Sequence, residues 1–171
     1  MKAKVLTSER LILKPLSLEH LSIDYVNWMN DTEVNKYLVS GGDYTFKDLE
    51  SYLKLQEEKD ILFWAIHLKE TNKHIGNIKI DPIDVLKRSG EYGIMMGDKS
   101  EWRKGFAKEA SHIVINYCFS EINLSAITLG VVKANSNAVN LYRQIGFICE
   151  KEIIDSKTNI VSLRMIKKND K

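Results

Sequence analysis

The chain has 171 residues, which is enough for one domain with a sizeable hydrophobic core, and we expect residues 1–171 to form that single domain. A net charge of +2, with 44% hydrophobic and 28% charged residues, is typical of a soluble globular protein and argues against nucleic acid or an acidic membrane as partner. The sequence contains no apolar run of about 18 residues, and its first residues lack the apolar stretch of a signal peptide. We therefore expect a cytoplasmic protein.

The pattern of cysteines and histidines predicts neither a metal site nor a disulfide. The chain has two cysteines and four histidines, and no two histidines stand three or four positions apart. Cys118 falls on the apolar side of a predicted helix, where a free thiol behaves as a small hydrophobic group.

The first third of the chain is predicted to form one strand followed by helices. Residues 10–16 alternate enough for a strand, and Ser17 is expected to cap a helix that continues to about Met29. Residues 31–38 are predicted as a second short helix, and residues 40–43 are the clearest loop.

One more helix follows this loop, and from residue 61 the hydrophobic period changes from helical to alternating. Thr45 and Asp48 resemble a capping box, which predicts a helix to about residue 57. Residues 61–68 and 74–81 are predicted as a hairpin, followed by a looser connection over 82–90 and a strand over 91–97. A long helix over 105–120, a strand over 125–132 and a short helix over 135–146 come next. Two terminal strands are predicted over 147–155 and 159–167. Strands mixed with helices around one core predict an α+β, or mixed α/β, domain.

The turn at residues 102–107 is the most informative segment for function. It connects a predicted strand to a predicted long helix, and it carries the basic residues Arg103 and Lys104 beside Gly105. The N-terminus of a helix offers free N–H groups and the positive end of the helix dipole, so this turn is suited to bind phosphate.

Two spaced motifs resemble the Gcn5-related N-acetyltransferase superfamily, and in particular its ribosomal-protein, polyamine and amino-sugar branch. The run 102–110 is similar to the pyrophosphate loop of this family, with Arg103 standing where glycine is usual. The pattern of the family's last helix is complete at Asn135, Ala138, Tyr142, Gly146 and Phe147. The resemblance implies a central, mostly antiparallel, twisted mixed sheet of about seven strands with about four helices and a splay between the strands at 91–97 and 125–132.

The same resemblance implies acetyl-CoA as co-substrate, without a metal, and assigns residues to its binding. A backbone N–H group freed by the splay would face the thioester carbonyl, and such a donor can contribute roughly 3 kcal/mol as negative charge develops. The resemblance also implies that Asn135 bonds the pantetheine or fixes the start of its helix. The full predicted coenzyme site comprises Ile94, Met95, Met96, Trp102, Arg103, Lys104, Gly105, Phe106, Ala107, Lys108, Asn135 and Tyr142.

Tyr142 and Glu91 are the predicted catalytic residues. The resemblance implies that Tyr142 acts as general acid toward the coenzyme A sulfur, yet full proton transfer from a phenol with pKa about 10 to a thiolate with conjugate pKa about 8.5 is uphill by about 2 kcal/mol. A hydrogen bond that strengthens as the thiolate forms is the better description. Glu91 is the candidate base toward the amine, directly or through water, and a salt-bridged surface glutamate is the alternative.

The acceptor is expected to be a primary amine that receives the acetyl group by direct transfer. Trp28, Asn30 and Tyr37 are predicted to bind it, although Trp28 also fits a core position on an amphipathic helix. An amino sugar, often nucleotide-linked among relatives, leads, followed by a protein N-terminus and then a polyamine. A non-catalytic acyl-CoA sensor is the alternative from another class, and homodimers are common among relatives.

Overall fold

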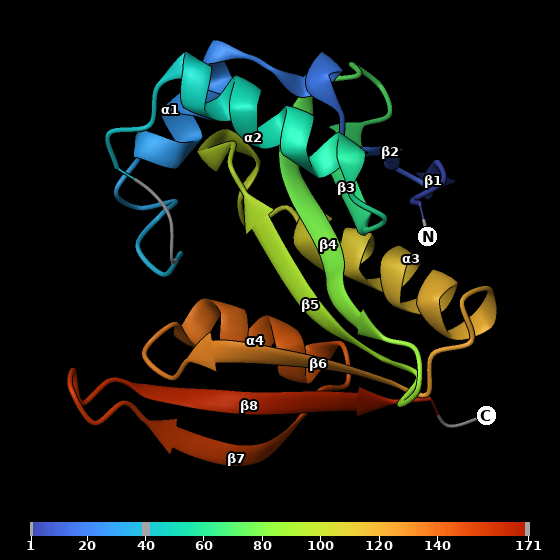
Figure 1. Cartoon of the computed structure of the whole chain (residues 1–171), viewed down its shortest axis with the longest axis vertical. Coiled ribbons are helices and arrows are strands. Elements are labelled where there is room, and N and C mark those ends of the chain that lie inside the picture. The colour runs from blue at the N-terminus through green and yellow to red at the C-terminus, as the bar shows by residue number, and fades with distance from the viewer. Residues whose placement is uncertain (1, 39–41, 170–171) are drawn as a thin grey trace.

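The computed structural model describes residues 2–38 and 42–169, which form one eight-stranded sheet with four α-helices (Figure 1). The strand order is β1-β2-β3-β4-β5-β6-β8-β7. The strands are β1 (Leu6–Thr7), β2 (Leu11–Pro15), β3 (Leu62–Leu68), β4 (His74–Asp84), β5 (Ser89–Met96), β6 (Ala126–Val132), β7 (Ile148–Ile154) and β8 (Val161–Lys168). The helices are α1 (Ile23–Asn30), α2 (Phe46–Glu58), α3 (Phe106–Ser120) and α4 (Ser136–Gln144). The predicted fold class is confirmed, with the two-residue β1 as a strand beyond the seven expected.

The sheet opens between β5 and β6, as predicted. Every other neighbouring pair is antiparallel, whereas β5 and β6 run parallel and pair at only three positions, the last of which is Glu91 with Thr128. Past this pair the two strands diverge, and Figure 1 shows the widening gap between them. Hydrogen bonding between parallel strands is slightly less stable per residue than between antiparallel strands, so ending this ladder after three pairs costs comparatively little.

The sheet has two faces with different helical cover. Along β3, Trp64 points into the core shared with α3 and α4, whereas Phe63 and Ala65 point into the core shared with α1 and α2. This alternation is the period of two that a strand imposes on its side chains. We call the side of α3 and α4 the coenzyme face and the side of α1 and α2 the acceptor face, after the ligands that the sequence predicts for them.

Two predictions near the N-terminus are wrong. Ser17 starts a 3-10 turn over Leu18–His20, and α1 begins only at Ile23, with Ser22 as its cap. Residues 31–38 form turns instead of a helix. The Asp31 carboxylate caps one helical turn, in which Asn35 N donates to Asp31 O at 2.9 Å. That turn is not continued, because most of the residues over 32–38 are exposed and offer little apolar surface for packing. Of the predicted loop over 40–43, residues 40 and 41 lie outside the described ranges.

The middle of the chain follows its predictions more closely. Thr45 and Asp48 form the predicted capping box of α2, with the Thr45 hydroxyl accepting from Asp48 N at 3.1 Å. The connection predicted over 82–90 is mostly strand, because β4 continues through a cis Asp81–Pro82 bond and β5 begins at Ser89. Cys118 is buried in the core as expected. Among the described residues, no helix combines the length and apolar character needed to cross a lipid bilayer.

Candidate active site

The open edge of β5 presents backbone groups to the splay. Gly97 N donates to Ile75 O at 3.0 Å, so the main chain at Gly97 faces β4. Because successive residues of a strand direct their N–H and C=O groups to opposite edges, Ile94 and Met96 face β6, and Met95 faces β4. Trp102 occupies one group of this edge, since its indole Nε1 donates to Met96 O at 2.9 Å. Of the three candidates, Ile94 and Met96 have the N–H direction that the splay requires.

The turn before α3 has the geometry of an anion-binding loop. Arg103 and Gly105 both adopt left-handed backbone conformations, with φ of 62° and 84°. The first main-chain hydrogen bond of the helix runs from Glu109 N to Gly105 O at 3.0 Å. The N–H groups of residues 106–108 therefore have no acceptor inside the helix and point out of its N-terminus. Arginine thus keeps the turn that glycine usually supplies.

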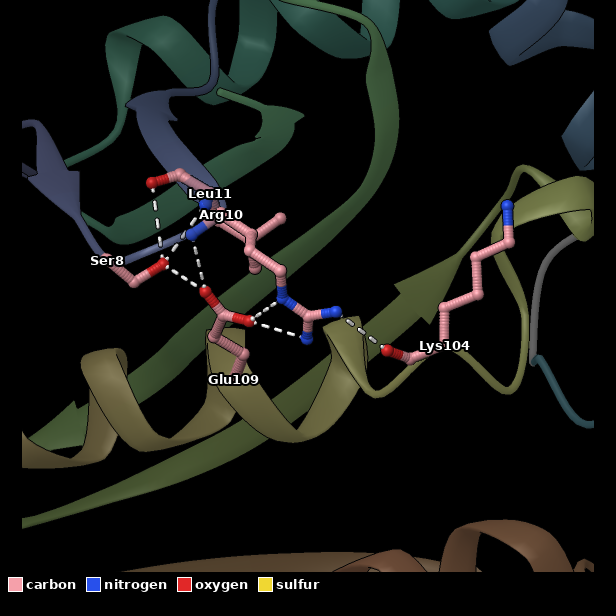
Figure 2. A network of polar contacts seen from close by, with 5 residues as sticks. All are labelled: Ser8, Arg10, Leu11, Lys104 and Glu109. Carbon is pink, nitrogen blue, oxygen red and sulfur yellow. Dashed lines mark hydrogen bonds and ion pairs between the residues drawn. The ribbon is translucent and has the colours of Figure 1, made fainter. Parts of the chain in front are cut away.

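A polar network attaches this loop to the start of β2 (Figure 2). The Arg10 guanidinium donates to Glu109 Oε2 at 2.7 Å and to Lys104 O at 3.0 Å. Ser8 Oγ donates to the other Glu109 oxygen at 2.7 Å. Burial alone raises the pKa of Glu109, but the bonds from Ser8 and Arg10 outweigh it, so this pKa lies below its ordinary value.

The side chains around the loop leave its positive charge partly neutralised. The ammonium group of Lys104 pairs with Glu101 at 2.9 Å, while Arg103 and Lys108 are exposed. Phe106 is buried beneath the Arg10 guanidinium, which lies 4.5 Å from its ring centre. A hollow of about 490 Å³ lies beside the loop, lined by residues that include Arg10, Lys104 and Phe106.

Tyr142 lies on the coenzyme face, on the buried side of α4. Its ring packs edge-on against Tyr92 at 5.6 Å, and 8% of the residue is exposed. Burial raises the pKa of Tyr142 to about 12, and its hydroxyl has no polar partner among residues 2–38 and 42–169. Asn135 begins the same helix and accepts from Ala138 N at 3.3 Å, which is the capping role anticipated for it.

Glu91 is ion-paired on the opposite face. Its Oε1 lies 2.6 Å from Arg164 Nη1, and its Oε2 accepts from Thr128 Oγ1 at 2.8 Å. Arg164 Nη2 also donates to Thr128 Oγ1 at 2.7 Å, which closes a ring of three side chains. The base role of Glu91 stays a prediction, and the salt-bridged alternative describes its contacts.

The three predicted acceptor residues have different surroundings. Trp28 is buried, with its ring 4.9 Å from that of His74. Both ends of the Asn30 amide are bonded to the backbone of Tyr44, at 2.8 and 2.7 Å. Tyr37 is partly exposed, and its hydroxyl donates to Ala134 O at 3.4 Å, next to the cap of α4. Their part in acceptor binding stays a prediction. Trp28 belongs to the apolar cluster that Met95 joins, and Tyr37 contacts the residue before the cap of α4.

Sequence reasoning missed two clusters that the fold assembles. Arg164 and Thr128 carry no local motif, and only their strand register brings them to Glu91. His20, His67 and His74 come together with ring centres 5.1 to 5.3 Å apart; His67 and His74 pair across β3 and β4, whereas His20 is far from both in sequence. Within the described residues, no group of three or more His, Cys, Asp or Glu side chains is arranged to hold a metal ion.

Comparison with known proteins agrees with this geometry. The family model of the acetyltransferase (GNAT) domain matches residues 10–148. A spermidine N(1)-acetyltransferase of Vibrio cholerae is 32% identical over 149 residues, 82% of this chain and 83% of that protein. The uncharacterized N-acetyltransferase p20 of Bacillus licheniformis is 27% identical over 157 residues, 84% of this chain and 82% of that protein.

Solved structures share the fold over almost the whole length. The spermidine N-acetyltransferase of Vibrio cholerae, solved in complex with CoA and spermine, superposes with a TM-score of 0.84 at 23% identity, covering 94% of this chain and 96% of that one. A GNAT-family acetyltransferase of Bacillus anthracis gives a TM-score of 0.83 at 19% identity, covering 96% of this chain and 98% of that one. Because the family model matches residues 10–148, which is most of this chain, the chain belongs to the GNAT family of N-acetyltransferases.

Proposed function

We propose that the protein transfers the acetyl group of acetyl-CoA directly to the primary amine of a small acceptor, with an amino sugar as the leading class. The observation that carries this proposal is the splay between β5 and β6, which opens beside the N-terminus of α3 and has Tyr142 on its coenzyme face. GNAT enzymes take acetyl-CoA as acyl donor, and this chain offers groups suited to each end of it.

The α3 loop suits the pyrophosphate. The free N–H groups of residues 106–108 and the helix dipole favour an anion, and the exposed Arg103 and Lys108 add positive charge. Ile94 and Met96 would place a backbone N–H against the pantetheine amide or the thioester carbonyl. A thioester supplies a carbonyl that is open to attack and a thiolate that can leave.

Tyr142 would stabilise the departing sulfur as a hydrogen-bond donor. With its pKa raised to about 12, the phenol keeps its proton throughout the physiological range. Transfer of that proton to a thiolate of conjugate pKa about 8.5 would be uphill by about 5 kcal/mol. Hydrogen bonding therefore describes the role better than complete proton transfer.

The acceptor amine must be neutral to attack. An α-amino group with pKa near 8 costs about 1.4 kcal/mol to deprotonate at pH 7, whereas an amine with pKa near 10.4 costs about 4.6 kcal/mol. Since the Glu91 carboxylate is engaged by Arg164 and Thr128, solvent can take the proton of a weakly basic amine. This favours an amino sugar, whose amine is weakly basic, over a polyamine.

Charge pairing on the acceptor face also favours an amino sugar over a polyamine. Asp31 and Glu33 both contact Lys99, at 2.7 and 2.9 Å, and Asp81 contacts Lys79 at 3.6 Å. A polycation would have to displace these lysines before it met a carboxylate. A polyamine, third in the order that the sequence predicts, moves ahead of a protein N-terminus as second candidate, because the relative that is 32% identical is a spermidine N(1)-acetyltransferase.

Thiol release from acetyl-CoA, measured across amino-sugar nucleotides, polyamines, aminoglycosides and short peptides with free N-termini, tests this proposal. Release with amino sugars alone supports it, and release with polyamines or peptides alone replaces the acceptor class. Binding of acetyl-CoA without release to any amine favours either a specific protein substrate or the non-catalytic sensor. Absence of coenzyme binding contradicts the role of the α3 loop.

A further inference from the structure

Three polar side chains from three strands meet at the point where the sheet opens. Glu91 of β5, Thr128 of β6 and Arg164 of β8 form a closed ring with contacts of 2.6, 2.8 and 2.7 Å. We call these residues the vertex cluster. Their neighbours Tyr92, Leu129 and Met165 point into the core beneath α3 and α4, so strand alternation places the vertex cluster on the acceptor face.

The vertex cluster lies at the last residue pair that joins β5 to β6. Glu91 and Thr128 are the last paired residues of the parallel ladder, and Gly130, two residues after Thr128, pairs with Arg164 of β8. A guanidinium that contacts both partners of the last pair connects β5 to the antiparallel β6–β8 pair at the vertex. Past this point the ladder contributes no bonds that could set the angle between the strands.

We propose that the vertex cluster sets the opening of the splay, so that Arg164 and Thr128 are positioning residues for the acetyl group and Glu91 acts with them rather than as a direct base. This proposal rests on the function proposed above. A small rotation at the vertex displaces the edge at Ile94 and Met96, where a preorganised N–H donor must meet the carbonyl to be effective.

The contacts are stronger than those of an ordinary surface ion pair. The side chains of Arg164 and Glu91 are 32% and 30% exposed, so solvent screens them only partly. Each member of the cluster bonds to both others, and hydrogen bonds to charged groups are roughly twice as strong as neutral ones. Thr128 is central, because its hydroxyl accepts from Arg164 and donates to Glu91.

Four variants separate positioning from proton abstraction. Thr128→Val keeps the shape and removes the central hydroxyl, while Thr128→Ser retains it. Glu91→Gln keeps an oxygen for Arg164 and an amide that can donate to Thr128, but it removes the charge that a base needs. Glu152→Gln is the matched control, because it breaks the 2.6 Å Lys133–Glu152 pair at the distal end of the same half-sheet.

The kinetic constants for acetyl-CoA and the pH profile are measured with the amine that the wild type acetylates. We expect Thr128→Val to lower kcat about tenfold, corresponding to the loss of one or two charge-assisted hydrogen bonds. Thr128→Ser and Glu152→Gln should stay within about twofold, and Glu91→Gln within about fivefold with the acidic limb of the profile retained. Wild-type rates for Thr128→Val, or loss of the acidic limb in Glu91→Gln, would overturn the proposal.

Two further measurements keep the proposal open to contradiction if a variant fails to fold or no amine is acetylated. If Thr128→Val does not fold, Arg164→Lys takes its place, because it keeps the charge without the two-pronged contact, and a wild-type kcat again overturns the proposal. Amide hydrogen exchange of the unliganded protein should rise about tenfold at residues 90–92 and 127–129 in Thr128→Val, and stay unchanged in Glu152→Gln. If the wild type acetylates no amine, the proposed function fails, while unchanged exchange at the vertex contradicts the cluster alone.

Discussion

The two faces of the splayed sheet are built in different ways. On the coenzyme face, the predicted groups come from three short segments: the open edge of β5 at Ile94 and Met96, the α3 loop, and the start and buried side of α4. On the acceptor face, the side chains come from α1, the turns after it and four separate strands. Backbone groups dominate the first face, and side-chain packing and ion pairs dominate the second. A chain can therefore keep one coenzyme site while its acceptor site changes.

Gly97 offers the strongest way to disturb the acceptor face. A Cβ atom there would lie 2.0 Å from Trp28 Cδ2, so Gly97→Ala forces the buried indole out of its place against His74. We expect the free energy of unfolding in urea to fall by about 3 kcal/mol.

Gly130→Ala on β6 is the control, because a Cβ atom at that position meets nothing within 4 Å. It should shift the free energy of unfolding by less than about 0.5 kcal/mol. If both alanines behave alike, the contact between Gly97 and Trp28 does not hold α1 in place.

Tyr142→Phe tests the coenzyme face. We expect kcat to fall about 100-fold, because the hydrogen bond to the leaving sulfur is lost, while the Kd for acetyl-CoA changes less than threefold. Steady-state kinetics and calorimetry measure the two quantities separately.

Tyr92→Phe removes a neighbouring phenol whose hydroxyl is 2.7 Å from Ser111 Oγ. It should lower stability by about 1 kcal/mol and leave kcat within about twofold. Equal kcat losses in the two variants would assign the effect to packing of the aromatic cluster.

The same contrast between faces explains what could be predicted from the sequence. The α3 loop and the cap at Asn135 depend on residues a few positions apart, and both stand where the motifs place them. The partners of Glu91 depend on strand register, which no local pattern specifies. The helix predicted over 31–38 stops after one turn although Asp31 caps it, because most of the following residues are exposed and lack the packing that stabilises a short helix.

The histidine cluster makes stability sensitive to acid. Burial lowers the pKa values of His20 and His67 and takes that of His74 to about 3, against about 6.5 in the unfolded chain. Below pH 6.5 the unfolded chain therefore binds more protons, so stability is retained above that pH and lost as the pH falls toward 3. The slope from His74 alone reaches about 1.4 kcal/mol per pH unit.

Urea unfolding between pH 7.5 and 4.5 measures this slope. His74→Gln should flatten it, because glutamine can still donate to Gly76 O or Asn77 Oδ1 but does not titrate. His112→Gln is the control outside the cluster: burial also lowers the pKa of this side chain on α3, so its removal should change the slope, but less than His74→Gln does. A slope that survives in His74→Gln assigns the acid sensitivity to His20 and His67.

The smallest expected effect separates the backbone of the α3 loop from its charge. Arg103 holds φ of 62°, a left-handed conformation that costs a residue with a Cβ atom about 1 kcal/mol. Arg103→Gly should therefore raise the free energy of unfolding by about 1 kcal/mol, while loss of the exposed positive charge raises the Kd for acetyl-CoA about threefold. Arg103→Gln keeps the backbone cost and removes the charge, so it should weaken binding equally without stabilising the protein. If glycine instead strengthens binding, the left-handed turn rather than the charge limits the affinity of this loop, and the coenzyme face depends on backbone geometry even more than its motif indicates.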